Sequence, residues 1–184
     1  TAATDIRLSI REAFDVHQRI LDWKHKYSVE GVPVTAVGLD ALTLKTMQWV
    51  MQDWKRMHFM NRFLGGTITP RVELDILPGL FSAAHFVMVR TAIPSMGDEI
   101  PTLIRAGESI QRFWLTATRL GLVMQPSLAP LCFAHYGKHQ IAFTSSVTMR
   151  NQAENLAVKL GHTAGVRNTD NVLFMGRLGV PKSI

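Results

Sequence analysis

Residues 99–126, EIPTLIRAGESIQRFWLTATRLGLVMQP, decide the fold that this sequence predicts. Apolar residues recur in the stretch at helical spacing, which predicts one long helix from about Glu99 to Leu120. Gly121 follows at the position where a glycine commonly ends a helix. On a helical wheel, five residues share one direction and form the predicted buried face: Leu103, Gly107, Ile110, Trp114 and Ala117.

The opposite side of this helix is basic. Arg105, Arg112 and Arg119 fall together on the wheel, and Glu108 is placed to pair with either of the first two arginines. This pattern is typical of a solvated face. The helix is therefore predicted to bury one side and to expose the other.

Shorter elements are expected on both sides of the long helix. A Ser-x-x-Glu capping box at Ser9–Glu12 predicts a helix over 9–24, and Asp40 is a predicted N-cap for a helix rich in Met and Trp. Further helices are expected at 128–136, ended by Gly137, and at 145–160, followed by Gly161. The predicted strands are 84–91, 122–124 and 171–178. Helices with a few strands between them predict the α+β class.

Composition limits what kind of protein this is. The chain has 184 residues, 47% of them hydrophobic and 18% charged, which predicts one globular domain over 1–184 and excludes disorder. The low charge indicates that a partner covers part of the surface. The longest apolar stretch, Leu80–Val89, contains Ser82 and His85 and is too short for a membrane span.

Cysteine usage and the N-terminus favour a cytoplasmic setting. The single cysteine, Cys132, excludes an internal disulfide, and no signal-peptide pattern is present. The net charge of +6 comes from dispersed basic residues, so a phosphate-bearing ligand or a basic surface explains it as well as a nucleic acid does. We expect neither a nucleic-acid partner nor a membrane.

Two groups of residues in the sequence are candidate sites. Cys132, His135 and His139 have a spacing that fits three zinc ligands, but Gly137 interrupts the segment and no fourth ligand is evident. A half-buried cysteine beside two surface histidines is the favoured interpretation, ahead of a zinc site or a Cys–His nucleophile pair. The second group could line a ring-shaped cofactor, although residues of this kind at helical spacing more often form core: Met47, Trp49, Met51, Trp54 and Met57.

The segment 106–126, AGESIQRFWLTATRLGLVMQP, resembles the nitroreductase family of FMN-dependent oxidoreductases. The family pattern is carried here by Ala106, Gly107, Gln111, Leu115, Ala117, Leu120, Gly121, Leu122 and Pro126. The closing FMGRLGVP is similar to the family's last core strand, through Phe174, Arg177, Gly179 and Pro181. The opening LSIREAFDVH also looks like a family helix, so the second half of the chain is covered well and the first half loosely.

The resemblance implies an α+β sandwich with a long central helix and a small, mostly antiparallel sheet, which forms a homodimer with FMN at the subunit interface. Electrons would pass from NAD(P)H to FMN and then to a nitroaromatic, a quinone or a similar acceptor. In the family, the segment after Leu-Gly-Leu lies along the flavin and offers a backbone N–H to flavin N5. The cofactor-binding residues implied here are Gln125, Pro126, Ser127, Leu128, Ala129, Arg177 and Lys182, with the Leu128 N–H as the donor to N5.

This sequence departs from the family at its beginning. The Arg-rich segment that grips the FMN phosphate and the Asn-bearing loop after it have no counterpart here, and only Lys182 follows the last strand as a basic residue. The chain therefore resembles the C-terminal portion of a longer nitroreductase-like protein, and the missing part is a candidate partner beside a second copy. The alternative is a non-catalytic interaction or ligand-binding module that has lost the flavin.

Overall fold

The computed structural model describes residues 2–37, 40–63, 71–91 and 99–181. They form two compact units, and the chain passes from one to the other more than once. Unit 1 comprises Thr1–Leu80 and Ala142–Gln152; unit 2 comprises Phe81–Ile141 and Ala153–Ile184. The expectation of one domain stays a prediction.

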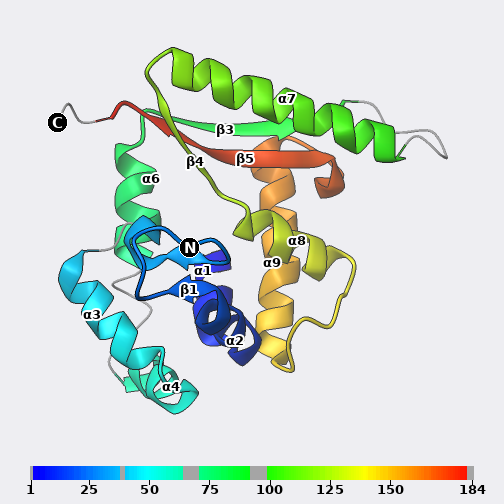
Figure 1. The fold of residues 1–184 in the computed structure, drawn as a ribbon. Coiled ribbons are helices and arrows are strands. Elements are labelled where there is room, and N and C mark those ends of the chain that lie inside the picture. Colours follow the sequence, from blue (N-terminus) through cyan, green and yellow to red (C-terminus); the bar gives the residue numbers. More distant parts are fainter. Residues whose placement is uncertain (1, 38–39, 64–70, 92–98, 182–184) are drawn as a thin grey trace. The chain divides into compact units, whose positions relative to one another are not determined.

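Unit 1 is mainly helical (Figure 1). Its helices are α1 (Ala2–Ser9), α2 (Arg11–Ile20), η1 (Val34–Val37), α3 (Ala41–Val50), α4 (Trp54–Phe63), η2 (Val72–Ile76) and α6 (Leu77–Phe81), which ends at the boundary with unit 2. Strands β1 (Leu21–Asp22) and β2 (Val32–Pro33) pair in parallel over two residues each.

The core of unit 1 is built largely from the predicted Met and Trp group. The buried residues are Phe14, Val50, Met51 and Met57, with Met47 and Trp54 among the partly buried residues packed against them. Phe14 and Trp54 meet edge to face, with 5.5 Å between ring centroids. The core interpretation is therefore correct for four of the five residues, whereas Trp49 is half exposed and lies under the Arg56 guanidinium.

The first predicted helix differs from the observed helices. A break at Ile10 separates α1 from α2, so Ser9 ends one helix instead of capping the next, and the N-cap Ile10 makes no side-chain cap bond. The Glu12 carboxylate accepts hydrogen bonds from the Thr144 hydroxyl and the Ser145 N–H, both at 3.2 Å. The predicted capping box is thus wrong, because a partner distant in sequence takes the glutamate. Asp40 does cap α3, accepting from the N–H groups of Leu42 and Thr43.

Unit 2 is centred on a three-stranded antiparallel sheet of order β3-β5-β4. The strands are β3 (Ala84–Val89), β4 (Val123–Pro126) and β5 (Val172–Gly179), and the helices are α7 (Glu99–Arg119), α8 (Ala129–Lys138) and η3 (Thr169–Asn171). Helix α9 (Val147–Ala164) begins in unit 1 and contributes its larger part to unit 2. The three predicted strands and the long helix are therefore present, with ends shifted by a few residues.

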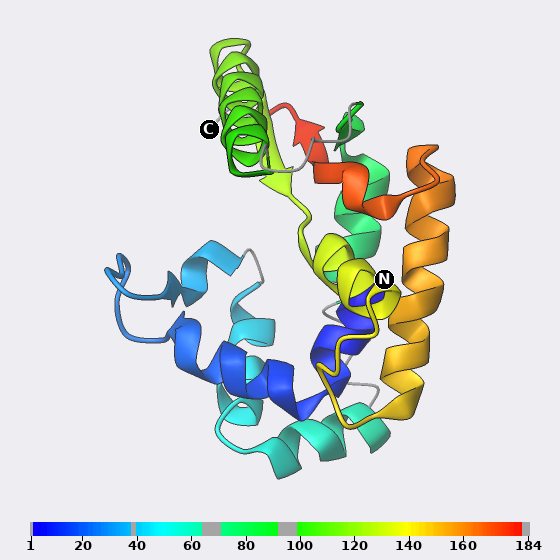
Figure 2. The ribbon, with the colours of Figure 1, turned by 90° about the vertical axis from the view of Figure 1, so that its right-hand side faces the viewer.

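Helices cover both faces of this sheet (Figures 1 and 2). On one face, Phe113 of α7 contacts Phe86 of β3 with 4.8 Å between ring centroids, and Trp114 lies 6.4 Å from Phe174 of β5. Met175 points to the other face, as alternation along a strand requires, and packs against a buried cluster of Ala134, Ala157 and Leu160 from α8 and α9. Unit 2 is thus a layered helix–sheet–helix structure.

The buried face predicted for α7 is wrong in direction. Trp114 is 41% exposed and Leu103 60%, Gly107 is exposed, and Ala117 is the buried residue of the five. The residues turned away from solvent are Thr102, Ala106, Ile110, Phe113 and Ala117, which fall on a stripe about 60° around the helix from the predicted one. The three arginines are exposed, as expected.

Two predicted helix ends are also wrong. Gly137 lies inside α8 and is buried, because α8 crosses α9 so closely that a Cβ at this position would lie 2.5 Å from the Ala153 carbonyl oxygen. Gly161 lies inside α9, whose C-terminal glycine is Gly165 at φ +66°. Gly121, at φ +74°, follows α7 as predicted.

The fold class is α+β, helix-rich with a small antiparallel sheet. Within the described ranges, none of the helices combines the length and the apolar character that crossing a membrane requires.

Candidate functional site

The segment implied to contact a flavin connects the sheet to α8. Gln125 and Pro126 end β4, opposite Arg177 and Gly176 of β5. The Ser127 N–H donates to the Met175 carbonyl at 2.9 Å, which continues the pairing by one residue. Leu128 is then the N-cap of α8, and Ala129 is the first helical residue. The Ser127 N–H is therefore engaged within the protein.

Helix α8 begins without a side-chain cap. Leu128 has an apolar side chain that accepts no hydrogen bond, and Pro130 in the first turn has no N–H. Within the described part of the chain, the Leu128 N–H meets no acceptor. The first N–H groups of a helix lack partners within it and carry partial positive charge, so this helix start offers donors to an electron-rich group.

The structure describes one of the two basic residues implied to bind FMN, Arg177, and not the other, Lys182. Arg177 donates from Nε and Nη2 to Gln125 Oε1, at 3.1 and 2.6 Å, so its guanidinium is held against the neighbouring strand. Lys182 lies outside the described residues. The structure thus brings Gln125 and Arg177 together, next to the Ser127–Ala129 segment.

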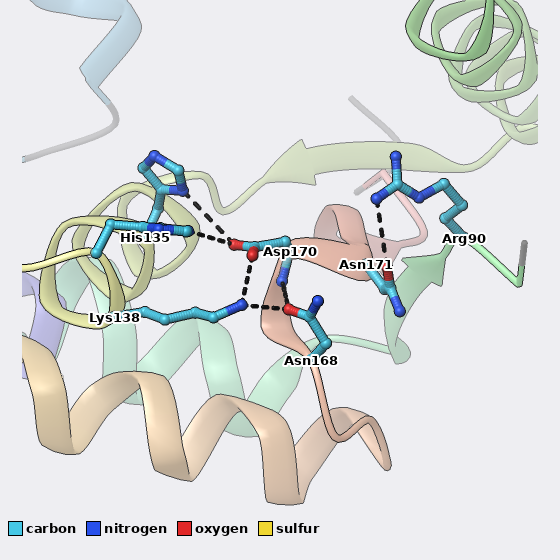
Figure 3. Close-up of polar contacts among 7 residues, drawn as sticks. Arg90, His135, Lys138, Asn168, Asp170 and Asn171 are labelled. Carbon is cyan, nitrogen blue, oxygen red and sulfur yellow. Dashed lines mark hydrogen bonds and ion pairs between the residues drawn. The ribbon is translucent and has the colours of Figure 1, made fainter. Parts of the chain in front are cut away.

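A second polar cluster joins the end of α8 to η3 (Figure 3). His139 Nε2 lies 3.0 Å from Asp170 Oδ1, and His135 Nδ1 lies 3.6 Å from the same oxygen. These three ligand atoms all lie within 4.8 Å of one another. Among the residues that the structure describes, this is the group whose donor atoms are arranged to share one metal ion.

Asp170 is held from several sides. Its second carboxylate oxygen, Oδ2, accepts from Lys138 Nζ, and the same ammonium group donates to Asn168 Oδ1. The Asp170 N–H donates to Asn168 Oδ1 at 2.9 Å, because Asn168 caps η3. Arg90 at the end of β3 binds the next residue, Asn171, through its backbone N–H and its side chain. The carboxylate therefore presents Oδ1 to the two histidines in a fixed orientation.

Hydrogen bonds and neighbouring positive charge favour the ionised form of this carboxylate. Partial burial raises the pKa of Asp170, but hydrogen bonds and positive charge from Lys138 and His139 outweigh it and lower the pKa below the ordinary aspartate value. The side chains of His135 and His139 are 54% and 42% exposed. The cluster is thus a surface site with one anionic oxygen and two accessible imidazoles.

Sequence reasoning identified two of these three groups. The two histidines lie at the surface, as the favoured interpretation expected, but Cys132 is exposed on α8 instead of half-buried, and it does not join the cluster. Asp170 takes its place from 31 residues beyond His139. No local spacing signals such a contact, because the packing of η3 against α8 creates it.

No protein-family model, curated protein or solved structure matches this chain.

Proposed function

We propose that the chain carries the flavin-ring segment of an FMN-dependent NAD(P)H oxidoreductase of the nitroreductase type. The observation that supports this proposal is the uncapped start of α8, which follows β4 directly and leaves the Leu128 N–H without a partner in the described residues. When bound, FMN would supply the transfer of two electrons from NAD(P)H to a nitroaromatic, a quinone or a similar acceptor.

The residues at this position fit the ring of the flavin. A backbone N–H at Leu128 can donate to a ring nitrogen without adding a group that titrates, and the exposed Leu128 side chain offers apolar contact. Ser127 is anchored to Met175, so the donor that follows it has a defined place at the end of the strand. The segment would hold and orient the ring.

The phosphate of FMN fits less well. Anionic phosphate is usually bound by arginine or lysine together with backbone N–H groups, and the Arg177 guanidinium already binds Gln125 Oε1. We therefore propose that a second copy or the remainder of a longer protein supplies the phosphate contacts. Apolar side chains exposed on α7 provide a surface for such a partner: Ile100, Leu103, Ile104 and Leu115.

The occupied Arg177 also favours a second candidate, a module of this fold that no longer binds flavin and acts by interaction alone. Binding of FMN distinguishes the oxidoreductase from the interaction module. The 184-residue chain is titrated with FMN, and quenching of flavin fluorescence and the visible absorbance of retained flavin are followed. Weak but saturable binding, strengthened by added N-terminal sequence, supports the oxidoreductase; no binding in either form supports the interaction module.

Substitution of Leu128 tests the backbone role. Leu128 has φ −91°, about 25° from the value near −65° that proline fixes, so Leu128→Pro removes the N–H and requires a modest backbone adjustment. Leu128→Ala is the matched control, because it keeps the N–H and removes the side chain. At saturating FMN, the proline variant should lower the rate of flavin reduction by NAD(P)H and the alanine variant should not. Equal effects of the two variants would refute a backbone contact.

A further inference from the structure

The cluster of His135, His139 and Asp170 has an arrangement that the flavin proposal does not use. One ring nitrogen comes from α8, one from its C-cap residue His139, and a carboxylate oxygen comes from η3; the oxygen lies 3.0 and 3.6 Å from the two nitrogens. Ligands about one tetrahedral or octahedral first-row ion stand at comparable separations, given metal–ligand bonds of about 2.0–2.2 Å. The three ligand atoms lie within 4.8 Å of one another, so rotation of the side chains would draw them onto one ion.

We propose that His135 Nδ1, His139 Nε2 and Asp170 Oδ1 bind a divalent first-row transition metal ion such as Zn²⁺. Imidazole nitrogen and carboxylate oxygen are established ligands of zinc, and sets of two histidines and one carboxylate also bind other ions of this row. The site does not depend on FMN, because its residues lie on the last turns of α8 and on η3.

The surroundings orient the ligands as outer-shell residues do in metal sites. Lys138 binds Oδ2 of Asp170 and leaves Oδ1 facing the histidines, while Asn168 fixes the turn that carries the aspartate. Arg90 secures the adjacent Asn171 from β3. The third ligand is thus held in place by the fold before any ion binds.

Three protein ligands leave the coordination incomplete. Zinc sites that serve only structure are usually closed by four protein ligands, whereas sites with three keep a position for water or a substrate. Both imidazoles are accessible to solvent. The ion would therefore be exchangeable and open to a water molecule or a small anionic ligand.

The same contacts also satisfy one another without a metal, as an ion-pair network in which protonated histidines donate to Asp170. Direct titration distinguishes the two. The untagged 184-residue chain, free of FMN, is titrated with ZnCl₂ by calorimetry, together with His135→Ala, His139→Ala and Asp170→Asn. His162→Ala removes an exposed histidine from α9, and Cys132→Ser removes the thiol next to the site in sequence; both serve as matched controls.

We expect one Zn²⁺ per chain and a loss of affinity of more than about 100-fold in each of the three ligand variants, beyond what an outer-shell change costs. The two controls should bind as the native chain does. No saturable binding by the native chain, binding that persists in all three ligand variants, or loss of binding in Cys132→Ser would each overturn the proposal.

A measurement on the native chain covers the case in which a variant does not fold. Diethyl pyrocarbonate modifies accessible histidines, and the modified residues are identified by mass spectrometry. Zn²⁺ should protect His135 and His139 and leave His162 reactive. Equal modification of His135 and His139 with and without Zn²⁺ would also overturn the proposal.

Discussion

Gly137→Ala should destabilise the chain, although alanine is the better helix former. At an open position inside a helix, this substitution gains about 0.5–1 kcal/mol, because glycine loses more conformational freedom on folding. At Gly137 the new Cβ would lie 2.5 Å from the Ala153 carbonyl oxygen, whereas nonbonded heavy atoms rest at about 3.5 Å. Helix α8 would have to move away from α9 by about 1 Å.

The obstacle is backbone, so no side chain can rotate to relieve it. Overpacking of this kind typically costs about 1–3 kcal/mol, which exceeds the gain in helix propensity. We therefore expect a net loss of up to about 2.5 kcal/mol in the free energy of unfolding. The displacement would also loosen the cluster formed by Ala134, Ala157 and Leu160.

Urea denaturation followed by circular dichroism measures this effect, with Gly107→Ala as the control. Gly107 lies inside α7, is exposed, and has no heavy atom near the place of a new Cβ, so alanine there should raise the urea midpoint. Gly137→Ala should lower it. A Gly137→Ala chain as stable as the native one would show that α8 and α9 are not in close backbone contact at this position.

Three further substitutions test local contacts. Asp40→Ala removes the cap of α3 and should lower the free energy of unfolding by about 0.5–2 kcal/mol in the same denaturation assay; an unchanged midpoint would contradict the cap. Phe174→Ala empties a buried position between Phe86 and Trp114 and should lower the free energy of unfolding by about 3–5 kcal/mol. A decrease below about 1 kcal/mol would contradict the place of Phe174 in the core. Hydrogen bonds from the Glu12 backbone N–H, Ser145 and Thr144 lower the pKa of Glu12, despite an opposing effect of burial. The ionised carboxylate therefore stabilises the fold above the unfolded-state pKa near 4.5, and this contribution is lost as the pH falls through the lower folded-state pKa. Glu12→Gln should therefore reduce the drop in melting temperature between neutral and acidic pH, and an identical pH profile in native and variant chains would refute this.

Elements with local signals were predictable from the sequence. Asp40 caps α3 through hydrogen bonds to residues two and three positions later, and Gly121 ends α7 through its own positive φ. Both features depend on a few consecutive residues. The length of α7 follows from the same kind of pattern, so its predicted and observed ends agree closely.

The buried face of α7 was not predictable in the same way. Apolar residues cover a wider arc of this helix than the sheet can cover, so a wheel does not determine which part of the arc is buried. The contact of Phe113 with Phe86 sets the rotation of α7 about its own axis. Leu103 and Trp114 then lie beside the buried stripe and stay partly exposed. Similarly, Glu12 fits a capping box by spacing, yet its partner Thr144 lies 132 residues away. Tertiary packing determines which face of α7 is buried and which residues bind Glu12, and the local sequence pattern does not specify that packing.

The candidate metal site depends partly on local sequence spacing and partly on tertiary packing. His135 and His139 are four residues apart, so a continuous helix places them on one face, and α8 is continuous because Gly137 serves a close helix crossing instead of a helix end. Cys132 and His139 are seven residues apart, which separates them by about 10 Å along the axis and excludes both from one ion's coordination shell on a straight helix. The third ligand must then come from another element, and η3 provides it through Asp170. The spacing of the two histidines therefore predicts that they lie together, whereas the third ligand depends on the packing of η3 against α8.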